Sequence, residues 1–189
     1  MRATPLVEDP AWYWGGGSGR GFVAETIPRY GGIVNNAAAN LAASGLMNLT
    51  AIFLEEGAVV SNIGYVIGTA GSSGQTAGFV ALYSDDQSTL MAQSAAITTN
   101  RTAVTDYLHP LVSPVQIVRS GIYYVANSFT ATTMPDMKGQ NYVNTVLVNC
   151  FGMKQLDSRP TNSGLGSTAP ATLTGFTTMA NRTPWFYLT

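Results

Sequence analysis

The residues of this chain that could do acid–base or nucleophilic chemistry are few. Asp106 and His109 lie three residues apart, and one of the many serines would complete the residue types of a Ser-His-Asp hydrolase. However, the chain has no Gly-x-Ser-x-Gly turn of the kind that exposes a serine nucleophile. Residues three apart in a strand also face opposite sides, which argues against a direct Asp106–His109 pair. We therefore expect His109, the only histidine, to be a structural or surface residue.

Two pairs of adjacent carboxylates are the next candidates. Glu55-Glu56 and Asp85-Asp86 each stand beside turn-forming residues, where neighbouring carboxylates repel and stay in water. A glycosidase needs two carboxylates across a cleft, a separation that sequence does not reveal. Calcium at Asp85-Asp86 is conceivable, but the spacing is not that of an EF-hand loop. We interpret both pairs as hairpin turns.

Cys150 is the only cysteine, so neither an internal disulfide nor a cysteine metal cluster can form. It lies in the strand-like stretch 143–151, and we predict a buried thiol that acts as a small apolar side chain. The run 19–24 formally fits Gly-x-Gly-x-x-Ala, but it follows glycines rather than a strand and has no βαβ context. We expect no catalytic residue, no cofactor and no metal.

Charge is scarce throughout the chain. Nine Lys or Arg and ten Asp or Glu make 10% of the 189 residues, against roughly 25% in an ordinary soluble domain. The net charge of −1 and the absence of a basic run argue against nucleic-acid binding. No apolar run approaches a membrane span, and the start lacks the apolar run of a secretion signal. A polar but uncharged surface is typical of a subunit that faces other protein.

Residues 1–32 differ from the rest of the chain. They hold three prolines, a Gly-rich run and a Trp-Tyr-Trp cluster, with no strand or helix periodicity. We expect an extended N-terminal arm whose aromatic side chains bury against a neighbour or against the chain's own body, a flexible leader being the alternative. The predicted partner-docking residues are Trp12, Tyr13, Trp14, Phe22 and Tyr30.

The remainder, 33–189, predicts one all-β domain. Residues 35–44 are alanine-rich and favour a short helix, although a leading strand fits equally well. Short β-branched and aromatic runs then recur between Gly, Asn and Asp turns, with a long irregular connection at 98–116. This pattern indicates an antiparallel β-sandwich with jelly-roll or Greek-key topology. The expected strands are 46–54, 59–68, 78–83, 89–94, 121–126, 143–151 and 185–188.

The segment 160–181 is rich in Thr, Ser, Gly and Pro and holds no charged residue. Composition alone would indicate disorder. Leu165, Leu173 and Phe176 recur within it, and a strongly strand-like terminus follows. We therefore predict an ordered long loop that returns the chain for a last strand.

Several stretches of the sandwich resemble a family of small virion proteins, encoded mainly by phages of actinobacteria, with jelly-roll-like β-sandwich domains. The resemblance covers about residues 46–189 and is moderately specific for the sandwich. It implies a head decoration, head-fibre or minor tail protein of the virion, made in the host cytoplasm, and brings no catalytic residue with it. The stretches that carry it are 57–63, 82–94, 120–125, and Ser163-Gly164-Leu165 before the terminal Pro-Trp strand.

A structural role in a virion is therefore the expected function. The expected partners are other copies of the chain, as a homotrimer, and the major capsid or tail proteins of the same particle. The alternative is a receptor- or carbohydrate-binding module at a tail or fibre, where Trp12, Trp14 or Trp185 with Tyr187 would stack on sugar rings of a host surface glycan. Core or subunit-contact roles are the more common use of such aromatic residues.

Overall fold

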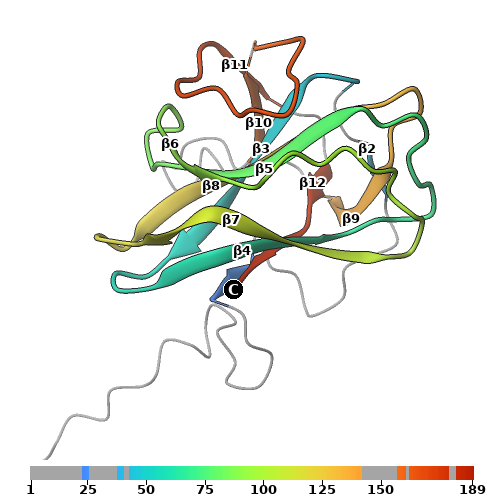
Figure 1. Cartoon of the computed structure of the whole chain (residues 1–189). Coiled ribbons are helices and arrows are strands. Elements are labelled where there is room, and N and C mark those ends of the chain that lie inside the picture. The colour runs from blue at the N-terminus through green and yellow to red at the C-terminus, as the bar shows by residue number, and fades with distance from the viewer. Residues whose placement is uncertain (1–22, 26–37, 41–42, 142–156, 161, 179–181) are drawn as a thin grey trace, which may run out of the picture.

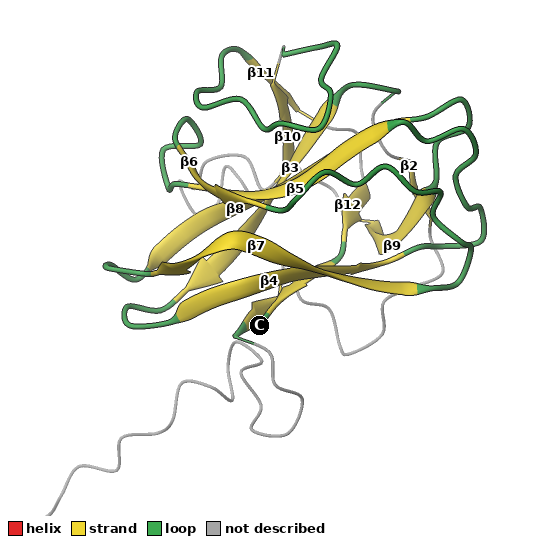
Figure 2. Cartoon of the chain, in the orientation of Figure 1, coloured by secondary structure: helices red, strands yellow, loops and turns green. Residues whose placement is uncertain are grey.

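The protein is an antiparallel β-sandwich, as the sequence predicts (Figures 1 and 2). The computed structural model describes residues 23–25, 38–40, 43–141, 157–160, 162–178 and 182–189. Every strand pairing in this part of the chain is antiparallel, and none of these residues is helical. Within the same residues no helix is long and apolar enough to cross a membrane.

Two sheets form the layers of the sandwich, and a third, small sheet lies at one end (Figure 1). The large sheet contains, in spatial order, β11 (Phe176–Thr178), β10 (Asp157–Pro160), β3 (Met47–Leu54), β8 (Gly121–Thr130), β5 (Ala77–Tyr83) and β6 (Leu90–Gln93). The small sheet contains β1 (Ala24–Glu25), β13 (Phe186–Leu188), β4 (Val59–Val66) and β7 (Asp106–Gln116). The end sheet contains β12 (Arg182–Pro184), β9 (Asp136–Asn141) and β2 (Ala38–Asn40).

The main core lies between the large and small sheets. Alternate side chains of each strand point into it, because successive residues of a strand face opposite sides. From the large sheet come Ile52, Leu82 and Val125, and from the small sheet Ile63 and Phe186, all with no exposed surface. Each such side chain contributes about 1.5–3 kcal/mol by leaving water.

A second core covers the opposite, outer face of the large sheet. Leu49, Phe79 and Tyr124 point outward from β3, β5 and β8, and they pack under residues 162–175 of the same chain. Leu173 of that segment is itself buried. Because β3, β5 and β8 are buried on both faces, apolar side chains occur on both faces of each strand.

The segment 162–175 is held over the sheet by hydrogen bonds to the strands beneath it. Tyr83 Oη donates to the Pro170 carbonyl at 2.7 Å, and the Ala169 amide donates to Gln93 Oε1 at 2.7 Å. The Leu173 amide bonds to the Ser88 carbonyl at 3.1 Å. The prediction of an ordered loop rather than a disordered one is confirmed for these residues.

One prediction of secondary structure is wrong, and one open alternative is decided. The irregular connection ends at residue 105, because 106–116 form β7, the longest strand. Its pattern is hidden by Pro110 and Pro114, which an edge strand of the small sheet tolerates. For 35–44 the sequence left a helix and a leading strand open, and the described residues Ala38–Asn40 form the strand, β2, which pairs with β9. A helix this short is marginal, so pairing with a neighbouring strand overrides its propensity.

Of the other predictions, some are confirmed and some concern residues outside the described part of the chain. Strands at 46–54, 59–68, 78–83, 89–94, 121–126 and 185–188 are confirmed with small shifts in their ends. The predicted strand 143–151, with Cys150, lies outside the described residues. Within residues 1–32, only 23–25 are described, and there β1 pairs with β13 and buries Ala24. The predicted docking residues Trp12, Tyr13, Trp14, Phe22 and Tyr30 lie outside the described part of the chain.

Candidate functional site

Strand β7 places its side chains alternately on the inner and the outer side of the small sheet. His109 points inward, and Asp106 points outward into solvent. The opposite orientation predicted for this pair is confirmed, and it separates the two groups that a Ser-His-Asp site would need together. The two sides of β7 therefore carry different clusters.

On the inner side, His109 stacks on Tyr65 at a centroid distance of 5.4 Å, and Tyr65 Oη lies 3.0 Å from His109 Nε2. Burial lowers the pKa of His109 to about 4, and the positive charge of Arg101 acts in the same direction. Burial raises the pKa of Tyr65. The imidazole is thus neutral and the phenol protonated at pH 7, and the two groups share one hydrogen bond.

Arg101 completes this inner cluster from the connection between β6 and β7. Its guanidinium lies 4.3 Å from the centre of the Tyr107 ring, a cation–π contact. Its Nε and Nη2 atoms donate to the Thr99 carbonyl at 3.0 and 2.7 Å. These contacts compensate a cation that is 4% exposed. The cluster holds the connection between β6 and β7 against β7 through the contact of Arg101 with Tyr107. The His109 imidazole and the Tyr65 phenol contact each other.

On the outer side, the ring of Tyr187 lies flat across β4. A Cβ atom at Gly64 would stand 2.0 Å from Tyr187 Cζ, so only glycine allows this position of the ring. Tyr187 Oη donates to both carboxylate oxygens of Asp106, at 2.7 and 2.9 Å. Burial and then this hydrogen bond raise the pKa of the Tyr187 phenol.

Trp185 extends the same arrangement toward β1. Its ring lies 5.2 Å from that of Tyr187 at 36°, and its Nε1 donates to Glu25 Oε2 at 3.2 Å. We call Glu25, Trp185, Tyr187 and Asp106 the outer aromatic cluster. The sequence pointed to the two aromatic residues, and the structure does bring them together. The sequence did not predict that Glu25 and Asp106 would neighbour these rings. No local sequence pattern indicates that β1 pairs with the last strand.

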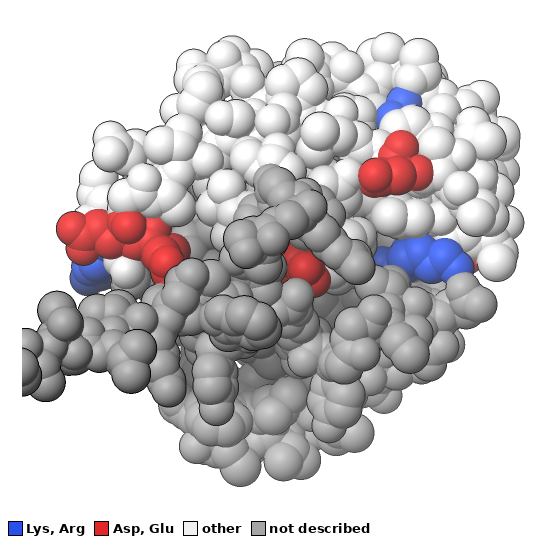
Figure 3. All heavy atoms as spheres, turned by 90° about the horizontal axis from the view of Figure 1, so that it is seen from below, with Lys and Arg blue, Asp and Glu red and all other residues white. Residues whose placement is uncertain are grey.

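Beside this cluster, β7 exposes a row of apolar side chains on alternate residues, Leu108, Pro110 and Val112. We call them the β7 apolar strip. Leu108 is 50% exposed and Val112 is 71% exposed. Leu108 is the register partner of Gly64, so the strip adjoins the outer aromatic cluster. Figure 3 shows the molecule from below, where the charged side chains of the described residues form a few separate groups.

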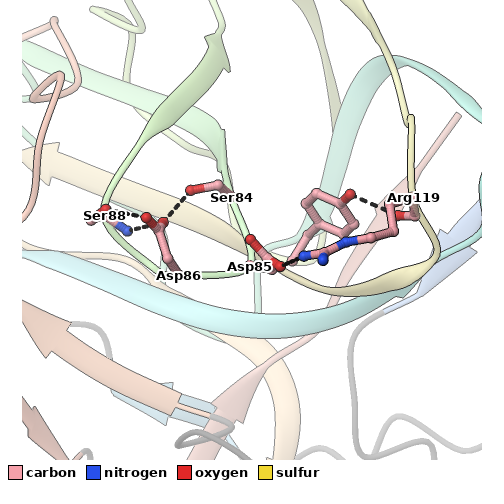
Figure 4. A network of polar contacts seen from close by, with 6 residues as sticks. Ser84, Asp85, Asp86, Ser88 and Arg119 are labelled. Atoms are coloured by element: carbon pink, nitrogen blue, oxygen red, sulfur yellow. Dashed lines mark hydrogen bonds and ion pairs between the residues drawn. The ribbon is translucent and has the colours of Figure 1, made fainter.

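Both carboxylate pairs lie in turns, but the hairpin prediction holds only for Asp85-Asp86, between the paired strands β5 and β6. It is wrong for Glu55-Glu56, where the turn joins β3 of the large sheet to β4 of the small sheet. Asp86 accepts hydrogen bonds from the hydroxyl of Ser84 and from the amide and hydroxyl of Ser88, which hold its pKa well below the usual range. Asp85 forms an exposed ion pair with Arg119 (Figure 4). Glu55-Glu56 occupy the exposed turn between β3 and β4.

The described ranges contain no group of three His, Cys, Asp or Glu side chains that could hold a metal ion. The chain matches no known protein family, no curated protein and no solved structure.

Proposed function

We propose that this protein is a non-enzymatic structural protein of a bacteriophage virion, specifically a capsid decoration protein. In this proposal the N-terminal segment docks on the shell, and the sandwich covers a junction of the capsid lattice. The sequence resemblance supplies the virion context. The β-sandwich and the low charge are consistent with it.

The observation that carries a subunit role is the β7 apolar strip. Interface cores are depleted in charged residues, and the strip contains none. A surface without charge fits a partner surface without charge, and other copies of this chain offer one. We therefore propose a second copy as the occupant of the strip, in a closed homo-oligomer such as a trimer.

The prolines of β7 set the geometry of such a contact. Pro110 and Pro114 have no N–H to donate, which disfavours the addition of a further strand at this edge. The strip therefore meets its partner through side chains of the sheet face. A face-to-face contact can close into a ring, whereas edge pairing of identical strands invites open-ended growth.

The oligomer is tested by light scattering on the purified full chain. We expect an oligomer for the wild type and a monomer for the double variant Leu108→Lys with Val112→Lys. Val118→Lys is the matched control, because Val118 is also exposed but lies outside β7. A wild-type monomer at micromolar concentration would contradict this contact.

The virion role is tested on purified particles of the phage that encodes the chain. We expect mass spectrometry to detect the protein in copy numbers set by lattice symmetry, and electron microscopy to place it on the head. Deleting residues 1–22 keeps β1 intact and should abolish attachment. A protein absent from the particles would refute the proposal, and attachment without residues 1–22 would refute the docking role of that segment.

A second candidate, a glycan-binding module, is favoured by the outer aromatic cluster. Aromatic rings that stack on sugars and carboxylates that accept hydroxyl hydrogen bonds are the groups such a site uses. Tyr187 is only 6% exposed, so the partly exposed Trp185 would be the stacking ring. Titration with host cell-wall glycans should then quench tryptophan fluorescence in the wild type and not in Trp185→Phe. No quenching at millimolar glycan would exclude this candidate.

A further inference from the structure

The inner face of the large sheet carries three polar side chains where apolar ones are expected. Asn48 and Thr50 lie on β3, and Asn127 lies on β8. They are 1%, 0% and 1% exposed. Both side-chain polar atoms of each asparagine and the hydroxyl of Thr50, five atoms in all, have no hydrogen-bond partner among the described residues.

Strand register places these side chains together. Asn48 and Asn127 are direct cross-strand partners, and such pairs have Cβ atoms about 4.5–5.5 Å apart. Thr50 follows Asn48 by two residues and therefore shares its face. That face is the inner one. Leu49 and Ala51, which alternate with Asn48 and Thr50 along β3, belong to the outer core. We call Asn48, Thr50 and Asn127 the inner polar triad.

Buried polar atoms of this kind are rarely left without partners. Each unmade hydrogen bond in a buried site lowers the folding equilibrium constant by a factor of roughly 5 to 160. Five such atoms in one place would be a heavy penalty for a sandwich of this size. The two amides do not bond to each other although they are cross-strand neighbours. No described residue supplies these partners.

We propose that the inner polar triad is an internal hydration site that holds ordered water between the layers of the sandwich. A buried water makes about three hydrogen bonds, and at most about four, to protein groups. Five atoms therefore require at least two water molecules. Water fits because the asparagine amides both donate and accept and the threonine hydroxyl does the same.

Ser128 provides a built-in contrast. Its hydroxyl is also buried and has no hydrogen-bond partner in the described part of the chain, but it lies on the opposite face of β8. Its register neighbours there are Met47 and Phe79. A water at Ser128 would find one polar side chain instead of three, and a buried water needs two to four polar partners. The proposal therefore assigns water to the triad and none to Ser128.

The direct test is to observe the water in the full-length protein. Nuclear Overhauser contacts between water and the side-chain amide protons of Asn48 and Asn127, or water density bonded to them in a high-resolution crystal structure, are the expected result. A structure in which the two amides bond directly to each other, with no water, would overturn the proposal.

A matched pair of variants tests the same site by equilibrium urea unfolding. Thr50→Val is nearly isosteric and removes a hydroxyl that binds water, so we expect the folding equilibrium constant to fall about tenfold. Ser128→Ala removes a hydroxyl that binds nothing, so we expect no decrease. An unchanged or increased constant for Thr50→Val would refute the hydration site. If Thr50→Val does not fold, the wild-type water measurement decides.

Discussion

The outer faces of the two sheets differ in how their apolar side chains are covered. The large sheet has its outer face covered by residues 162–175 of the same chain, which bury Phe79, Tyr83 and Tyr124. The small sheet exposes the β7 apolar strip on its outer face. The chain thus covers the outer face of the large sheet with its own residues and leaves apolar side chains of β7 exposed on the outer face of the small sheet.

This difference shows how an almost uncharged chain can fold and still offer a contact surface. The uncharged segment 162–175 stays on the large sheet because its backbone hydrogen-bonds to the residues beneath it and a few of its apolar side chains, such as Leu173, pack into the second core. The small sheet instead lays Tyr187 across Gly64 and leaves Leu108 beside it exposed. The first arrangement supplies stability, and the second is where we place association.

The largest expected effect comes from weakening the cover. Leu173→Ala removes a buried side chain from the second core and should lower the free energy of unfolding by about 2–4 kcal/mol. Urea unfolding measures this change. The neighbouring Thr172→Ala is the control, because Thr172 is exposed and should change stability by less than about 0.5 kcal/mol. Equal effects of the two substitutions would mean that the segment is not a true part of the core.

Next in size is the contact that shapes the small sheet. Gly64→Ala places a methyl group against the Tyr187 ring and should cost about 1–3 kcal/mol as the ring is forced away. Gly121→Ala is the matched control, because a Cβ atom there meets nothing within 4 Å. Thermal unfolding of both variants compares them. A neutral Gly64→Ala would show that Tyr187 does not need its present position.

Acid should weaken the inner cluster of the small sheet. The pKa of His109 is about 4 in the folded protein and 6.5 in a free side chain, so between these values the unfolded state binds more protons. Stability therefore falls as the pH drops from about 7 to 4. Because the imidazole is partly screened by solvent, we expect a loss of about 1–2 kcal/mol.

His109 is the only histidine, so its variant isolates this contribution. In His109→Gln the unfolding free energy, measured in urea at pH 7 and pH 4.5, should change less with pH than in the wild type. An identical pH dependence in both proteins would show that His109 does not contribute to the loss of stability in acid.

The smallest effect on stability is expected at the apolar strip itself. Val112→Ser should change the free energy of unfolding of the monomer by no more than about 0.5 kcal/mol, since the side chain is exposed. The adjacent Leu111→Ala, at a buried residue, should cost about 2–3 kcal/mol. Urea unfolding at low protein concentration distinguishes the two sides of β7. A large loss in Val112→Ser would mean that this side chain is part of the monomer core.

Local chemistry in the sequence predicted much of the fold. Strand ends at Glu55-Glu56 and Asp85-Asp86 follow from adjacent carboxylates beside turn residues, and the opposite orientation of Asp106 and His109 follows from the two-residue period of a strand. The prolines of β7 hid that strand, because Pro is a strong local breaker whose tolerance depends on an edge position that only the sheet order reveals.

The candidate sites depended on tertiary structure much more heavily. Trp185 and Tyr187 could be named from composition, but Glu25 joins them only because β1 pairs with the last strand. The inner polar triad is equally invisible in sequence, since Asn48 and Asn127 are ordinary polar residues until register sets them opposite each other.

The sequence by itself thus determined an all-β chain with little charge, turns at its carboxylates and an ordered uncharged loop before the last strand, because these follow from local propensity and periodicity. Only the tertiary structure decided which apolar faces are closed, which is exposed and which polar groups meet in the core. Those outcomes depend on pairings between strands far apart in the chain, and no local pattern encodes them.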